Sequence, residues 1–202
     1  AGVGTFGLMD YGSNNGYGVI PAPISPWTKI YKGWSDYEQI SDFGQINIDT
    51  DDIKKINISS DEYLLIENKN NWIKENIDID SLRNKYKIWD LGIQDSIPGY
   101  FFDVLTQEMS SEQIILSEST NVILGFDNYN YGFPGSGILV WSINEDIITQ
   151  SNIQLGINNV PSNKAIEIIE ADGGKDIGQD CYHWNPSFCD VLTKGWEYDL
   201  WY

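Results

Sequence analysis

Short runs of apolar and β-branched residues recur between residues 45 and 170, and turn-forming residues separate them. Two of these runs alternate apolar with polar positions, and the others are nearly continuous, as in strands buried on both faces. This pattern predicts strands at residues 45–49, 53–58, 62–68, 121–126, 137–143 and 165–170. We therefore expect a β-rich α+β fold with a mixed or antiparallel sheet.

Glu67 stands in one of these runs, directly after four apolar residues. Two interpretations are open. It is either a buried carboxylate with a partner, or the residue that marks the solvent end of the strand, which is the commoner case for Glu.

A short helix is predicted near the N-terminus, between Ser25 and Gly33. Ser25 is a good N-cap, Pro26 suits the first helical position, and Gly33 suits the C-terminal cap. Trp27, Ile30 and Trp34 recur at helical spacing, so this face is expected to pack into the core.

Residues 70–112 are polar and irregular, with a short helix expected around 81–86, and strand patterning is clear on both sides of them. We interpret this stretch as an insertion. The predicted organisation is a single segment, 1–202, in which 1–42 carry a turn and the helix, and 43–202 form a β-rich subdomain with the insertion 70–112.

The charge of the chain restricts its partners. The formal net charge is −18, which argues against binding nucleic acid or an anionic membrane surface. No run of about 18 apolar residues occurs, so no membrane span is predicted. The acidity suits calcium binding in an extracellular protein, although keeping an aromatic surface in solution is a simpler explanation for most of it.

Cys181 and Cys189 are the only cysteines, and they flank a short loop that contains Pro186. An isolated pair of this kind favours a disulfide in an oxidising compartment. The alternative is a Cys-His-Cys metal site with His183, the only histidine, but this spacing matches no strong zinc pattern.

Asp172, Asp176 and Asp180 are spaced by four along a Gly-rich loop and could offer oxygen ligands to Ca²⁺. The spacing is not that of an EF-hand, and acidic residues beside Gly-Gly are also common in solvated turns. A set of tryptophans allows a further interpretation, a calcium-dependent glycan-binding module, although most of them stand in apolar runs typical of a core. They are Trp27, Trp34, Trp141, Trp184, Trp196 and Trp201.

Several segments resemble, in the same order, the immune inhibitor A-like family of secreted zinc metallopeptidases. They are Gly4–Gly12, Pro23–Trp34, Tyr63–Asn68, Phe133–Trp141 and Ile169–Gly173. Metzincin-like enzymes place a tight turn with a methionine beneath the metal, downstream of the helix that bears H-E-x-x-H. The resemblance implies that this chain is the C-terminal half of the peptidase domain, a metzincin-like subdomain with Met9 as the Met-turn residue.

The chain departs from the family in two ways. The H-E-x-x-H helix is absent, so no zinc ligand and no general base can be named in this chain. Ser142 stands where family members often carry His. The resemblance thus implies zinc in the parent family but not here, and a chain that is inactive alone.

The function that the resemblance implies is membership of a secreted zinc-dependent metalloendopeptidase-like protein. Its partners would be the missing N-terminal half of the domain, or a neighbouring chain, and a protein or peptide substrate. One alternative is an inactive homologue that serves as an extracellular structural or adhesive module. The other is the calcium-dependent glycan-binding module.

Overall fold

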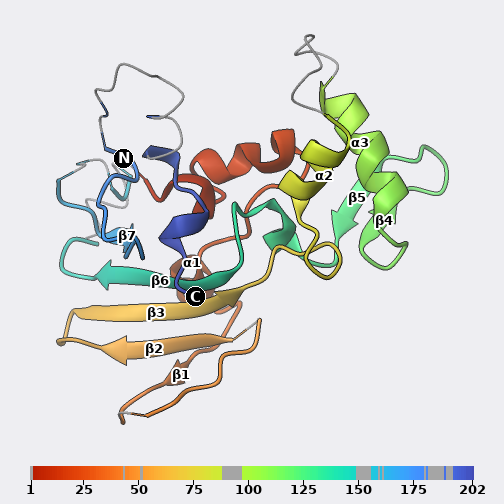
Figure 1. Cartoon of the computed structure of the whole chain (residues 1–202). Helices are drawn as coiled ribbons and strands as arrows, with labels where there is room; N and C mark the ends of the chain where they lie inside the picture. Colours follow the sequence, from red (N-terminus) through yellow and green to blue (C-terminus); the bar gives the residue numbers. More distant parts are fainter. Residues whose placement is uncertain are drawn as a thin grey trace.

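A mixed five-stranded sheet forms the centre of the fold, with the strand order β1-β2-β3-β6-β7 (Figure 1). β1 runs parallel to β2, and every other neighbouring pair is antiparallel. The strands are β1 (Glu38–Gln39), β2 (Ile53–Asn57), β3 (Glu62–Lys69), β6 (Gly137–Asn144) and β7 (Ile166–Ile168). The chain is thus a β-rich mixture of helices and strands, as the sequence predicts.

The computed structural model describes residues 2–42, 44–50, 52–87, 97–148, 156–158, 160, 162–179, 181, 189 and 193–202. The helices in these ranges include η1 (Gly4–Phe6), η2 (Tyr11–Gly18), α1 (Pro26–Tyr31), α2 (Ile79–Lys85), α3 (Ile97–Glu108), η5 (Tyr129–Gly132) and η6 (Glu197–Asp199). Within the described ranges, no helix has the length and apolar character that crossing a bilayer requires.

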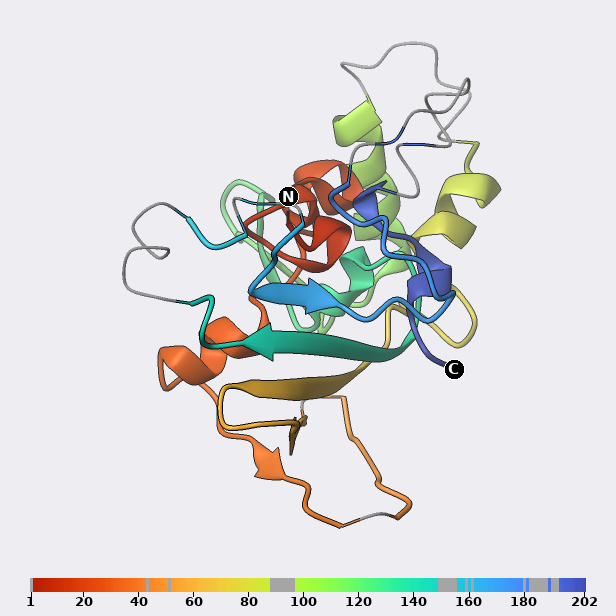
Figure 2. The same ribbon diagram turned by 90° about the vertical axis from the view of Figure 1, so that its left-hand side faces the viewer.

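β3 and β6 are the longest strands, and they pair along their whole length, from Glu62 opposite Asn144 to Lys69 opposite Gly137. Their alternating residues enter a first core in which Leu65, Leu139 and Ile143 are fully buried. Burying one such side chain contributes about 1.5–3 kcal/mol, which explains why the strand pattern is clearest here. Figure 2 shows the N-terminal 3₁₀ helices on the side of the sheet where β6 and β7 lie.

Glu67 is buried, so the commoner interpretation of this residue is wrong. Its carboxylate lies 2.8 Å from the amine of Lys69, and the Trp141 indole donates a hydrogen bond of 3.1 Å to it. These partners, supplied by β3 itself and by β6, compensate the loss of water around the charge.

A second core lies away from the sheet and joins α2, α3 and the two-stranded sheet β4 (Ile114–Leu116) and β5 (Ile123–Phe126) (Figure 1). Leu82, Phe101 and Leu105 are almost fully buried there. The description of residues 70–112 as irregular apart from one short helix is therefore wrong, because α3 also lies in this stretch. The expectation of a buried strand at 121–126 is wrong as well: β5 exists, but Leu124 is 67% exposed.

Two further expectations fail locally. Residues 45–49 form no strand, since no neighbouring segment pairs with their backbone as a ladder. The Asn68 side chain instead donates a hydrogen bond to the Ile48 carbonyl.

The α1 helix forms with Ser25 accepting from the Thr28 amide, as predicted, and Trp27 is buried. Trp34 follows the end of that helix and is 63% exposed, so it does not share the core face.

The C-terminal segment, residues 193–202, returns to the start of β6. The Ile138 and Trp201 backbones exchange two hydrogen bonds, of 2.7 and 2.9 Å. Leu200 is 1% exposed in the first core, and the Thr5 hydroxyl donates to the Gly195 carbonyl at 3.2 Å. This segment therefore connects the N-terminal residues, β6 and the loop that follows β7.

Candidate functional site

A tight turn places Met9 on the surface. The Asp10 amide donates to the Gly7 carbonyl at 3.0 Å, and the Asp10 carboxylate accepts from the Gly4 amide at 2.8 Å. Gly7 is needed here because a Cβ would lie 2.4 Å from a methyl group of Val3. The turn leaves Met9 97% exposed.

Met9 stands at the edge of an apolar groove of about 710 Å³, which we call the Met9 groove. Its walls come from the N-terminal turn, α1, β6 and β7. Its larger side chains are Leu8, Met9, Trp27, Trp34, Trp141 and Ile166. The residues that line it in the described part of the chain include no His or Cys, so nothing there fits a catalytic zinc ion.

Hydrogen bonds to Glu145 hold Trp27, one of the residues that line the Met9 groove. The Trp27 indole and the Tyr63 hydroxyl both donate to the same carboxylate oxygen, at 3.1 and 2.6 Å. Trp27 also stacks on Tyr31, with ring centroids 5.0 Å apart. The indole of Trp27 is therefore held in one orientation in the wall of the groove.

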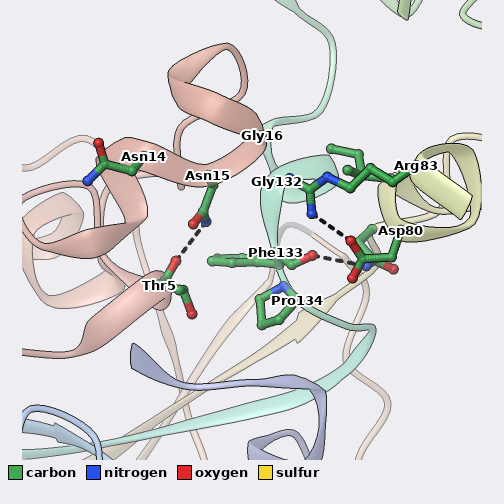
Figure 3. A pocket seen from close by; sticks show the side chains of 11 residues that line it. Thr5, Asn14, Asn15, Gly16, Asp80, Arg83, Gly132, Phe133 and Pro134 are labelled. Atoms are coloured by element: carbon green, nitrogen blue, oxygen red, sulfur yellow. Dashed lines mark hydrogen bonds and ion pairs between the residues drawn. The ribbon is translucent and has the colours of Figure 1, made fainter. Parts of the chain in front are cut away.

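A second, smaller pocket of about 200 Å³ lies between η2, α2 and the 132–134 segment (Figure 3). Its polar groups bond to one another: the Asn15 amide donates to the Thr5 carbonyl at 2.8 Å, and Arg83 pairs with Asp80 at 2.6 Å. The first of these bonds links η2 with η1 and the second lies within α2, and neither places a nucleophile next to a base.

An acidic cluster lies beyond β7, formed by Glu170, Asp172, Asp176 and Asp199. Carboxylate oxygens of Glu170, Asp172 and Asp199 all lie within 4.8 Å of one another. Asp176 belongs to the same site, since a Cβ added at Gly174 would contact oxygens of Glu170, Asp172 and Asp176 at 2.9, 3.0 and 3.3 Å. Asp199 comes from η6 in the C-terminal segment, while the others lie on the loop after β7.

Because the buried carboxylates of this cluster are removed from water, their charged forms are destabilised. Asp199 is 0% exposed and Glu170 6%. Burial, reinforced by the neighbouring carboxylates and opposed by the hydrogen bond from the Trp196 amide, raises the pKa of Asp199 to about 7. Burial likewise raises the pKa of Glu170 and of Asp176.

Two oxygens of the acidic cluster lack hydrogen bonds. Asp176 Oδ1 and Asp199 Oδ1 are both buried and have no donor. None of the ion pairs between described residues includes a carboxylate of this cluster. Lys164 lies nearby, but its amine donates to the Ile177 carbonyl. The site therefore carries concentrated negative charge, and the charge of Lys164 acts on Glu170 and Asp176 without forming an ion pair with either.

The structure brings together two of the three aspartates that the sequence suggests. Asp172 and Asp176 lie in the cluster, and Asp180 is outside the described residues, as is His183. The disulfide between Cys181 and Cys189 is confirmed, with Cα atoms 5.4 Å apart. The Asp172 carboxylate also accepts from the Gly174 amide at 2.8 Å, which orders the Gly-rich loop.

Sequence reasoning missed Glu170 and Asp199. Glu170 ends the predicted strand at 165–170, so its position beside Asp172 was a usable signal. Asp199 enters the site only because the C-terminal segment folds back onto the sheet, and no spacing in the sequence shows that contact. Compared with models of known protein families, with curated proteins and with solved structures, this chain has no significant match.

Proposed function

We propose that this chain is part of a secreted zinc-dependent metalloendopeptidase-like protein, and that it forms the wall of the active-site region rather than the zinc site itself. The observation that carries the proposal is Met9, which is 97% exposed on a tight turn beside an apolar groove. A methionine that merely fills a core would be enclosed by its own chain. The proposal also rests on the resemblance of the ordered segments to that family.

The Met9 groove would receive the polypeptide that carries the zinc ligands. Its residues are apolar and large, which suits burial against another chain or segment and does not suit coordination of a metal. Zinc would supply an activated water for hydrolysis of the peptide bond, and the residues that hold the metal would come from outside the present residues.

The coding sequence upstream of residue 1 provides the first test. The proposal expects an H-E-x-x-H motif there, and zinc-dependent cleavage of casein by the longer protein that is lost when the Glu of that motif is replaced by Gln. The 202-residue chain alone should contain no stoichiometric zinc by metal analysis. Zinc at one ion per chain, lost in His183→Ala, would instead support a Cys-His-Cys site.

An upstream sequence without the motif would favour the second function, an inactive extracellular module. Exposed aromatic side chains near the groove support one form of it, glycan binding. Tyr31 and Trp34 are 59% and 63% exposed on and just after α1, and flat aromatic surfaces of this kind stack on sugar rings. Retention on insoluble polysaccharides, compared between the unmodified chain and Trp34→Ala, separates this function from the peptidase-like one.

A further inference from the structure

We propose that Glu170, Asp172, Asp176 and Asp199 bind one Ca²⁺, and that this ion ties the C-terminal segment to the end of β7. The site differs from the loop that the sequence suggests, because the aspartate that completes it comes from η6. It is also separate from the Met9 groove, so it stands whether or not the peptidase-like function is correct.

The distances suit a single ion. Calcium takes oxygen ligands at about 2.3–2.6 Å, so two oxygens on opposite sides of one ion lie up to about 5.2 Å apart. The oxygens of Glu170, Asp172 and Asp199 all fall within 4.8 Å of one another. One ion can therefore contact all three carboxylates without a large movement of the backbone.

An independent observation points to a ligand. The side chain of Asp199 is fully buried, its Oδ2 accepts from the Trp196 amide at 2.7 Å, and its Oδ1 has no hydrogen-bond partner. A buried carboxylate oxygen without a donor is costly, and a cation supplies the missing interaction. Asp176 Oδ1 is a second oxygen in the same condition.

The ligand types select calcium over other metals. Every donor in the cluster is a carboxylate oxygen, which suits Ca²⁺ or Mg²⁺ and disfavours zinc and copper. The loop that carries Asp172 contains Gly173, at φ +82°, and Gly174, so it can adjust to the larger and less regular shell of calcium. Magnesium requires a stricter octahedron and retains more of its water.

The ion would reinforce a junction between two parts of the chain that hydrogen bonds already join. Ala171 already donates a backbone hydrogen bond to the Asp199 carbonyl at 3.2 Å, and the Trp201 indole donates to the Ile169 carbonyl at 3.0 Å. Without a cation, four carboxylates repel each other across this junction. With one, the same charges attract a common centre and hold the C-terminal segment against the sheet.

Calorimetric titration of the disulfide-intact chain with CaCl₂, after treatment with EDTA, tests the site. We expect one ion per chain, and a thermal midpoint about 5–11 °C higher at a hundredfold excess over Kd. Asp172→Asn keeps the acceptor for the Gly174 amide and removes only charge; it should weaken binding about tenfold or more. Asp199→Asn should abolish binding. The matched control, Asp146→Asn, changes an exposed aspartate outside the cluster and should bind as the unmodified chain does.

Absence of binding at 10 mM CaCl₂, about ten times the Kd of the weakest extracellular sites, overturns the proposal. The proposal is also overturned if Asp172→Asn and the unmodified chain bind calcium with equal affinity. If Asp199→Asn does not fold, Asp172→Asn decides alone, because its side chain is on the surface. Hydrogen exchange then tests the tie: calcium should slow exchange of the Ile138 and Trp201 amides, and unchanged exchange in a chain that binds calcium would refute that part.

Discussion

Lys69 lies 2.8 Å from Glu67, and the two side chains are each only 4% exposed. They are two residues apart on β3, so both point to the same face of the sheet. Lys29 from α1 approaches the same carboxylate at 3.8 Å. The sheet thus contains a buried charge pair whose partners come from three elements, α1, β3 and β6.

Replacing Lys69 by Met should lower the free energy of unfolding by about 3 kcal/mol, because it leaves the Glu67 charge buried with weaker partners. The double variant Glu67→Gln, Lys69→Met should lose less, since no net charge is then buried. Urea unfolding of the two variants and the unmodified chain gives the comparison. Equal losses in the single and double variants would show that packing, and not charge, matters at this position.

Glu108 should control acid stability. The amines of Lys85 and Lys74 and the Tyr86 hydroxyl donate to its carboxylate. These hydrogen bonds, that of Lys85 foremost, lower the pKa of Glu108 to about 2 from its ordinary 4.5. A lowered pKa in the folded state contributes stability above the unfolded value of 4.5, and this is lost as pH falls through about 2.

Glu108→Gln should therefore cost about 1 kcal/mol at pH 7 and less as the pH falls from 4.5 to 2, since these groups are partly solvated. Glu112→Gln is the control, as Glu112 is exposed on the same part of the chain. Urea unfolding at a series of pH values provides the curves. A constant difference between Glu108→Gln and the unmodified chain across that range would contradict the assignment.

Truncation of Met9 should hardly change the stability of the isolated chain, whereas truncation of Phe6 should lower it strongly. Met9→Ala should change the free energy of unfolding by no more than about 0.5 kcal/mol, as expected of a surface side chain. Phe6→Ala should cost about 3–5 kcal/mol, because Phe6 is 0% exposed and its ring centroid lies 5.8 Å from that of Phe133.

In a longer protein that includes the polypeptide preceding residue 1, Met9→Ala should become costly if the Met9 groove is covered there. Thermal unfolding of both lengths measures the difference. A neutral substitution in both lengths would leave Met9 without a partner and weaken the peptidase-like proposal.

Reduction of the Cys181–Cys189 disulfide should destabilise the chain by about 2–3 kcal/mol, the loop-closure entropy of a short cross-link. Intact mass before and after alkylation establishes the bond, and thermal unfolding with and without dithiothreitol gives its effect. Replacing both cysteines by Ser should reproduce the reduced state. Two thiols that react with iodoacetamide before reduction would contradict the structure.

The strands that the sequence predicts best are those whose apolar residues enter the first core. In β3 and β6, Leu65 and Trp141 are buried because the strands pair with each other, so local pattern and tertiary environment agree. Residues 45–49 have the same alternation, but Ile46 and Ile48 find no ladder partner. An alternating apolar–polar pattern alone does not supply the neighbouring strand that a strand must pair with.

α3 escaped prediction because Pro98 and Gly99 stand near its start and usually signal a turn. Proline is tolerated in the first turn of a helix, where its missing N–H has no partner to lose. The later residues Phe101, Val104 and Leu105 follow helical spacing and are buried, and they carried the signal that was overlooked. In the candidate site, Asp172 can be predicted from the sequence, whereas Asp199 joins the site through a contact that only the folded chain creates.

The register of β3 and β6 has an architectural consequence. Lys69 and Gly137 are directly opposite each other, so the chain leaves the sheet and re-enters it at neighbouring points. The pair is equivalent to a β-hairpin whose connecting turn has been replaced by a folded unit, which shares the second core with Ile20 of the N-terminal segment. Such a junction accepts large changes in loop length at small entropic cost. Shortened or enlarged versions of this protein are therefore expected to differ within residues 70–136, away from Phe133, which packs in the first core.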